Sequence, residues 1–391
     1  MEKLLTYSGD EVKITEKVVK AAAGNRGSGK EVMALLLNQR GNAIIVTPGL
    51  VKTLVGSLNG LAMENFLTYY GDEVKITEEV VEAVVGMVGG GNEEMMALLL
   101  NQRGNAIIVT PGLVETFAGY FDALAMEKLL IYYGDEVKIT EEVVKAAAGN
   151  DYEGKEIMAL LLDQRGTEVK ITDEVVKVAA GNEGSGREVM ALLLDQRGTE
   201  VKITEEVVKA AAGNGRSGKE VMALLLDQCG DAIIVTPGLV ETLAGSFDAL
   251  AMEKLLICCG DEVKITEEVV KAAAGNGSSG KEVMALLFDQ RGDAIIVTPG
   301  LVETLAGSFN ALAMEKLLTY YGDEVKITEE VVKAATGNEY SSKEMMALLL
   351  DQRGTEVKIT EEVVKAAAGN GSSGKEVMAL LLDRRGTEVN Y

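Results

Sequence analysis

The chain has 391 residues, of which 47% are apolar and 4% aromatic, and it contains no histidine and no tryptophan. Its formal net charge of −23 predicts that nucleic acid is not a partner, because phosphates are bound by clustered lysine and arginine side chains. The lack of histidine removes the commonest general base, and no apolar stretch is long enough to predict a membrane-spanning helix.

A tandem repeat fills the chain from Gly9 to Arg385. Eight long repeats begin at Gly9, Gly71, Gly134, Gly166, Gly198, Gly260, Gly322 and Gly354, and four slightly shorter repeats begin at Gly41, Gly104, Gly230 and Gly292. A period of roughly 32 residues is typical of a solenoid, in which each repeat buries its apolar face against its neighbours. We expect a single array over residues 1–391, with complete repeats at 9–385 and partial repeats at 1–8 and 386–391.

The first part of each repeat predicts an extended segment followed by a helix. In the repeat that begins at Gly198, residues 201–203 alternate apolar and charged side chains, as in a short strand that would add a narrow parallel sheet. Thr204 precedes two glutamates, which predicts a helix N-cap, and a proline follows the same threonine in every short repeat. Gly213 and Asn214 then predict a left-handed stop.

The second part predicts another helix, because Ser217 stands three residues before Glu220 as in a capping box. The segment VMALLL that follows is apolar on nearly every side, so this helix packs on both flanks. The fold class is therefore all-α, an α-solenoid of about 12 helix-turn-helix repeats of roughly 30–33 residues. Short extended segments, VKI or IIV, are expected between the repeats.

One motif resembles a nucleotide-binding loop: GxxxxGK occurs five times, as at Gly24 to Lys30. A phosphate-binding loop follows a strand and has Ser or Thr after the lysine, whereas here a helix precedes the motif and Glu31 takes the place of the hydroxyl residue. The other carboxylates recur identically in each repeat, as a structural role predicts. We expect no catalytic residue, no cofactor and no enzymatic activity.

Three cysteines, Cys229, Cys258 and Cys259, are the other candidates for chemistry. Adjacent cysteines lack the CxxC spacing, and without histidine three thiols leave a zinc site incomplete, so no metal is expected. The cysteines replace an arginine and a tyrosine pair of other repeats, and we interpret them as free thiols at tolerant positions. Free thiols are typical of an intracellular protein, and no signal peptide precedes the first repeat, so a cytoplasmic location is expected.

Differences between the copies concentrate in the loop between the two helices. Loops on one edge of a solenoid commonly carry recognition residues, although an exposed loop also simply tolerates change. The candidate partner-binding residues in these loops are Arg26, Asp151, Tyr152, Glu183, Arg216, Glu339 and Tyr340.

The phrases EVKITEEVVKAAAGN and GKEVMALLLDQ resemble the short tandem helical repeats of large fungal proteins, which are ankyrin-like and accompany NACHT domains in NOD-like receptors. The second helix ends like an ankyrin helix in LLLDQRG, but the TPLH start of an ankyrin repeat is absent. The resemblance implies a non-catalytic array that binds an unidentified protein, as the recognition part of such a receptor. The alternative is a structural spacer or a self-associating solenoid, since the partial repeats at both ends predict either a piece of a longer protein or end-to-end stacking.

Overall fold

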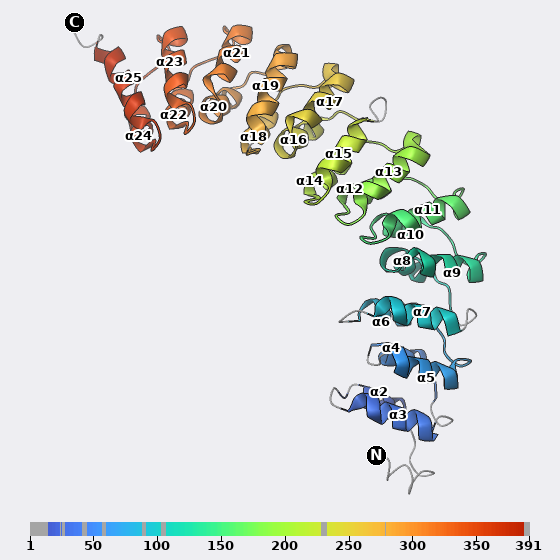
Figure 1. Cartoon of the computed structure of the whole chain (residues 1–391). Helices are drawn as coiled ribbons and strands as arrows, with labels where there is room; N and C mark the ends of the chain where they lie inside the picture. Colours follow the sequence, from blue (N-terminus) through green and yellow to red (C-terminus); the bar gives the residue numbers. More distant parts are fainter. Residues whose placement is uncertain are drawn as a thin grey trace. The chain divides into compact units, whose positions relative to one another are not determined.

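The computed structural model describes residues 15–23, 25, 28–40, 45–56, 60–87, 91–102, 107–227, 233–277 and 279–386 (Figure 1). Within these residues the structure has 24 α-helices, three short 3-10 helices and no regular strand. The chain forms two compact bodies, an N-terminal body at Met1–Leu192 and a C-terminal body at Leu193–Tyr391. No helix in the described ranges is long and apolar enough to cross a membrane.

Each repeat contributes a first and a second helix. The first helices of the N-terminal body are α2 (Glu16–Ala23), α4 (Pro48–Val55), α6 (Glu78–Val85), α8 (Pro111–Tyr120), α10 (Glu141–Ala148) and α12 (Asp173–Gly181). Its second helices are α3 (Gly29–Arg40), α5 (Gly60–Tyr70), α7 (Asn92–Gln102), α9 (Ala123–Tyr133) and α11 (Gly154–Arg165), and the boundary between the bodies falls within α13 (Gly186–Arg197).

The C-terminal body has the same order of elements. Its first helices are α14 (Glu205–Gly213), α16 (Pro237–Ser246), α18 (Glu267–Gly275), α20 (Pro299–Ser308), α22 (Glu329–Gly337) and α24 (Glu361–Gly369). Its second helices are α15 (Gly218–Asp227), α17 (Ala249–Cys259), α19 (Gly280–Arg291), α21 (Ala311–Tyr321), α23 (Ser342–Arg353) and α25 (Gly374–Gly386). The 3-10 helices η3 (Gly198–Glu200), η4 (Gly260–Glu262) and η5 (Gly292–Ala294) lead into the extended segments.

Two helical layers run through each body. First helices contact the first helices of neighbouring repeats, as in α8 with α10, and second helices contact second helices, as in α9 with α11 (Figure 1). The core lies between the layers, where valine and alanine from the first helices meet methionine and leucine from the second; Val143, Ala147, Met158 and Leu161 are fully buried. The prediction of an all-α solenoid is confirmed.

The expected narrow sheet does not form in the described residues. The extended segments make only isolated parallel bridges, at Ile76 with Ile107, Ile203 with Ile233, and Ile265 with Ile295. Each of these bridges joins a long repeat to the short repeat that follows it. Two or three residues per repeat are too few to propagate a ladder of hydrogen bonds, so the layer remains a row of single contacts.

The threonine N-cap is confirmed, and it also links repeats. The Thr236 side-chain oxygen accepts a hydrogen bond from the Leu239 backbone N–H at 3.1 Å, and its hydroxyl donates to the Glu205 carboxylate of the preceding repeat at 2.7 Å. Hydrogen bonds from Lys209 and from Thr236 lower the pKa of Glu205. All four prolines occupy the first helical turn, as predicted.

The asparagine that follows the first helix acts as a clasp between repeats. Asn150 is 2% exposed, and its amide donates to the carbonyls of Ala118 and Phe121 in the preceding repeat, at 3.2 and 3.1 Å. Its side-chain oxygen accepts from the backbone N–H groups of Tyr152 and Glu153, both at 3.0 Å. One side chain therefore orders its own loop and fastens that loop to the previous repeat.

The hydrogen bonds of this asparagine take the place of two predicted features, the left-handed helix stop and the capping box. Asn214 has φ = −77°, so the left-handed stop predicted at Gly213 and Asn214 is wrong; an Asx turn ends the helix instead. The capping box is wrong too, because Ser217 bonds with Asn214. An Asx turn made by the Asn214 side chain, and not a glycine in the left-handed conformation, therefore ends the helix.

The junction after a repeat supplies a hydrogen bond to the extended segment. Between two long repeats, the Arg165 guanidinium donates to the carbonyls of Gly134 and Val137 at 2.8 and 2.9 Å and pairs with Glu168 at 2.6 Å. The hydrogen bond from Arg165 lowers the pKa of Glu168. Where a short repeat precedes a long one, the Tyr133 hydroxyl instead accepts from the Ile107 N–H at 3.0 Å.

Candidate functional site

The loops between first and second helices carry the predicted site residues, and all of those that the structure describes are exposed. They are Asp151, Tyr152, Glu183, Arg216, Glu339 and Tyr340. Tyr152 is 91% exposed and Tyr340 is 72% exposed, which is a high exposure for large aromatic side chains. Arg26 lies outside the described residues. The loops therefore present the variable side chains to solvent, each in its own repeat.

Loops of consecutive long repeats pack closely on one another. A side chain at Gly184 would collide with the Asp151 carbonyl oxygen, 2.0 Å from where its Cβ would stand. The Ser185 hydroxyl donates to the Asn150 carbonyl at 2.6 Å, and in the C-terminal body the Ser372 hydroxyl donates to the Glu339 carbonyl at 2.7 Å. The loops of two consecutive long repeats therefore pack directly against each other.

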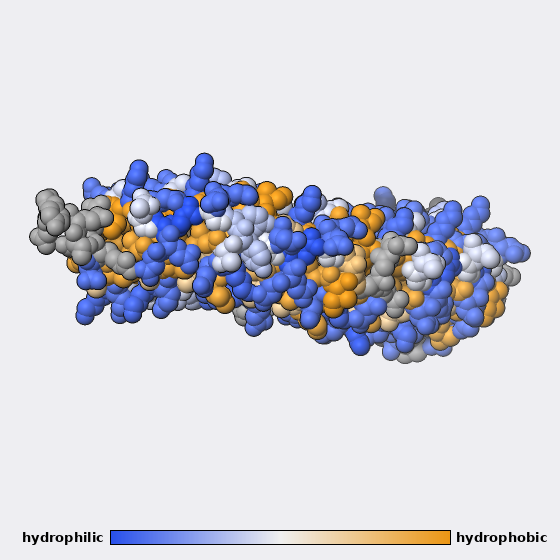
Figure 2. Space-filling view, turned by 90° about the horizontal axis from the view of Figure 1, so that it is seen from above, coloured by the Kyte–Doolittle hydropathy of each residue, from blue (hydrophilic) through white to orange (hydrophobic). Residues whose placement is uncertain are grey.

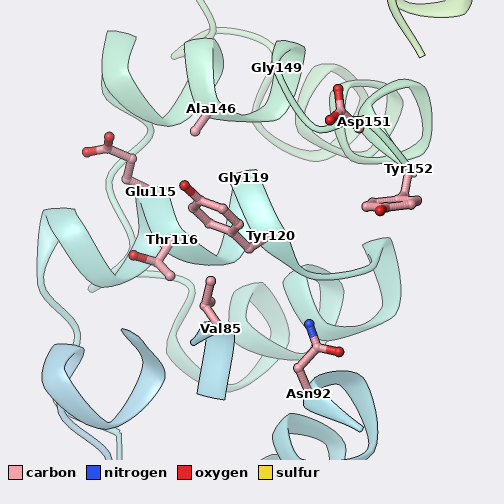
Figure 3. Close-up of a pocket in the computed structure, with 10 residues that line it drawn as sticks. All are labelled: Val85, Asn92, Glu115, Thr116, Gly119, Tyr120, Ala146, Gly149, Asp151 and Tyr152. Carbon is pink, nitrogen blue, oxygen red and sulfur yellow. The ribbon is translucent and has the colours of Figure 1, made fainter. Parts of the chain in front are cut away.

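A short repeat interrupts this packing, because it lacks the long loop. Beside α8, the N-terminal body has an open cavity of about 630 Å³, lined by residues of this short repeat and of the long repeats on either side (Figure 3). The residues that line it are Val85, Asn92, Glu115, Thr116, Gly119, Tyr120, Ala146, Gly149, Asp151 and Tyr152. We call this cavity the loop notch.

Two tyrosines and two carboxylates give the loop notch its chemistry. Tyr120 projects from the end of α8 to the centre of the labelled residues in Figure 3, and it is 63% exposed. Tyr152 and Asp151 come from the loop after α10, and Glu115 comes from α8. Aromatic faces beside carboxylates form an environment that favours a cationic group.

Tyr120 was missed by the sequence-based prediction, although a signal was present. Ser57, Ser246 and Ser308 occupy its position in the other short repeats, so the tyrosine is a single departure outside the variable loop. The preceding long repeat also departs from the other long repeats, because it has one extra residue in the glycine-rich loop that ends at Gly91, which has φ = 88°. The two departures lie in adjacent repeats, and Tyr120 lines the loop notch.

At the equivalent position in the C-terminal body, a lysine of the chain contacts the tyrosine ring. There the loops of two long repeats flank the short repeat that begins at Gly292, and the Lys281 ammonium lies 3.9 Å from the centroid of the Tyr340 ring. This is a cation–π contact between side chains two repeats apart. Tyr340 corresponds to Tyr152 in the repeat alignment. The tyrosine at this repeat position therefore contacts a lysine of the chain in the C-terminal body and borders an open cavity in the N-terminal body.

The loop that carries the GxxxxGK motif does not have the geometry of a phosphate-binding loop. It follows helix α10, and Asn150 already accepts from the N–H groups of Tyr152 and Glu153 that would face a phosphate. Among the described residues, no group of three or more histidine, cysteine, aspartate or glutamate side chains is placed to hold a metal ion. Arg291, which forms an RGD tripeptide with Gly292 and Asp293, pairs with Asp261 of its own repeat at 3.0 Å and is largely covered.

The prediction of free thiols is wrong for Cys258, which is disulfide-bonded, whereas Cys259 has a free thiol. Burial raises the pKa of the Cys259 thiol, with the charge of Glu262 adding to the effect.

A helical-repeat protein is similar to this chain in structure. It is the pentatricopeptide repeat protein PPR10, crystallised in complex with an 18-nt psaJ RNA element, with 14% sequence identity and a TM-score of 0.36. The alignment covers 98% of this chain and 66% of that chain, slightly less than two thirds. That neighbour was crystallised with RNA, so the prediction that nucleic acid is not a partner, which rested on net charge alone, is not kept. Net charge is a sum over the whole molecule, whereas a nucleic acid contacts one face.

No curated protein matches the chain. A family model described as a domain of unknown function (DUF7104) matches residues 4–33, 35–56, 66–96, 129–158, 160–190, 192–222, 224–246, 255–284, 286–308, 317–346 and 348–378. These matches follow the repeat through both bodies and cover most of the chain. The tandem helical repeats that the sequence predicts and the structure displays thus belong to this family, and the chain is a member of the DUF7104 family.

Proposed function

We propose that this chain is a non-catalytic repeat scaffold that binds a protein partner along the edge formed by its inter-helix loops. The observation that carries the proposal is the coincidence of sequence variation with exposure at that edge. Tyr152 and Tyr340 differ from the residues of other repeats and project into solvent, while the buried residues beneath them are nearly the same in every repeat. Exposed tyrosines are typical anchors of protein interfaces.

The character of the surface supports this role. Hydrophilic residues dominate the face seen in Figure 2, with hydrophobic residues in separate patches between them. A large hydrophobic anchor on a charged surface is typical of an interface that forms and dissociates. From the resemblance to fungal ankyrin-like arrays, we propose the recognition part of a NOD-like receptor in the cytoplasm as the biological setting.

Affinity capture with matched variants tests the proposal. Immobilised wild-type chain is compared with a variant that carries Tyr152→Ala, Arg216→Ala and Tyr340→Ala, using a nuclease-treated lysate of the cells that make the chain. The control carries Tyr132→Ala and Tyr320→Ala, two tyrosines that are each 55% exposed at the ends of second helices. We expect the wild type and the control to retain the same protein, and the loop variant to lose it.

The alternatives predict other outcomes. A partner that the loop variant retains and the control loses would place the interface on the other edge. A complex that is captured from an untreated lysate and lost from the nuclease-treated one would show that RNA or DNA is the ligand, and so would overturn a protein partner. A molar mass that rises with concentration in light scattering, equally in all variants, would favour the self-associating solenoid.

A further inference from the structure

The geometry points to a specific ligand chemistry for the loop notch. We propose that it binds the cationic side chain of a basic segment, arginine or lysine, from the partner protein. The inference rests on the proposed function, because it names the partner's chemistry at one part of the loop edge. Three observations support the inference. They are a lysine of the chain that contacts the equivalent tyrosine in the other body, a reversal of charge at one position, and the residues that line the cavity.

The lysine that contacts the equivalent tyrosine is Lys281. Its ammonium group lies 3.9 Å from the centroid of the Tyr340 ring, above the short repeat that begins at Gly292. Tyr152 occupies the same place relative to the short repeat that begins at Gly104. A cation thus lies over one face of the ring in one body, which shows that the geometry of long, short and long repeats accommodates an ammonium group at this distance.

The reversal of charge is at Glu93. Counted back from the end of the second helix, this residue corresponds to Lys281, and every other long repeat has a lysine or arginine there. Glu93 is exposed and follows Asn92, which lines the loop notch. Glu93 therefore places a carboxylate where the counterpart of Tyr152 in the C-terminal body has the lysine that contacts its ring. Tyr152 itself is 91% exposed.

The lining completes the argument. The faces of Tyr120 and Tyr152 bear the partial negative charge of aromatic rings, and Glu115 and Asp151 add carboxylates to the same lining. No lysine or arginine is among the residues that line the cavity. A volume of about 630 Å³ is large enough for an arginine or lysine side chain together with the backbone that carries it.

The test is a titration of tyrosine-labelled full-length chain with capped peptides, followed by NMR of the tyrosine rings. The probes are acetyl-Ala-Ala-Arg-Ala-Ala-amide, the same peptide with lysine, and the same peptide with uncharged norleucine. We expect the arginine and lysine peptides to shift the resonances of Tyr120 and Tyr152 saturably, and the norleucine peptide to leave them in place. Equal shifts with norleucine, or shifts spread over all the tyrosines, would overturn the proposal.

Three variants make the result specific. Tyr152→Phe keeps the aromatic face and should bind like the wild type, whereas Tyr152→Leu should weaken the arginine peptide about fivefold or more. Glu93→Lys restores the residue type of the other repeats and should fill the loop notch from within, shifting the Tyr152 resonance and weakening the peptide by at least as much. A Glu93→Lys variant that is folded by circular dichroism and binds the peptide unchanged would refute the inference.

Failure here is distinguishable from failure of the scaffold function. A protein partner that is lost with the triple loop variant but retained by Glu93→Lys would leave the loop edge as the interface and would exclude a cationic anchor in the loop notch. A partner retained by every variant would exclude both.

Discussion

The clasp between repeats predicts a large, local effect from a single substitution, Asn150→Ala. The change removes two hydrogen bonds to the carbonyls of Ala118 and Phe121 and two from the N–H groups of Tyr152 and Glu153. Each bond contributes about 1 kcal/mol, and water can replace the two in the exposed loop, so we expect a loss of about 2–4 kcal/mol. The buried carbonyls left without a donor account for most of this loss.

Native-state hydrogen exchange is the appropriate measurement, because a repeat array opens locally and a global melting temperature averages over repeats. A loss of about 2–4 kcal/mol corresponds to amide exchange about 30 to 1,000 times faster in α8 and α10. The exposed neighbour Asp151→Ala is the matched control and should change little. Asn150→Asp keeps the acceptor oxygen for the loop but cannot donate, so it should release the contact with α8 and leave the loop turn in place.

The reasoning would be refuted by exchange in α8 that is less than about threefold faster in Asn150→Ala, since that difference is below about 1 kcal/mol. It would also fail if Asn150→Asp protected α8 as well as the wild type does. In that case the donated bonds to Ala118 and Phe121 would contribute nothing to the coupling between repeats.

Two further predictions concern the contacts between repeats. Tyr133→Phe removes the acceptor of the buried Ile107 N–H and should destabilise the surrounding repeats by about 1–3 kcal/mol in urea titration; an unchanged midpoint would contradict this. Hydrogen bonds from Lys271 and Thr298 lower the pKa of Glu267, so its contribution is complete above the unfolded value of about 4.3 and is lost as the pH falls through the lower folded value. Glu267→Gln should lose less stability than the wild type between pH 5 and pH 3, roughly; parallel pH profiles would contradict the assignment.

The sequence predicts a local element well where the residues that determine it are only a few positions apart along the chain. The threonine caps a backbone N–H three residues away, and proline restricts its own φ, so both were predictable from a single repeat. The repeat period together with an apolar second helix was enough to predict the solenoid. For the same reason the variable loops were located correctly on the exposed edge.

The remaining features depend on residues that are distant in sequence. Asn214 was assigned a left-handed stop because its nearest neighbour is glycine, but its counterparts bond to carbonyls of the preceding repeat. The narrow sheet was expected from alternation alone, whereas the structure has single bridges. Neither outcome follows from one repeat, because each depends on the separation between the backbones of adjacent repeats.

The sequence by itself thus determined the repeat, the order of the helices, the threonine N-caps of the first helices and the edge on which the copies differ. Only the tertiary structure decided that Tyr120 and Tyr152 line one cavity, that loops of consecutive long repeats close on each other, and that a short repeat leaves the loop notch. The physical reason is distance along the chain. Caps and turns are made by atoms a few residues apart, whereas a cavity is the space left by three successive repeats after their cores have packed.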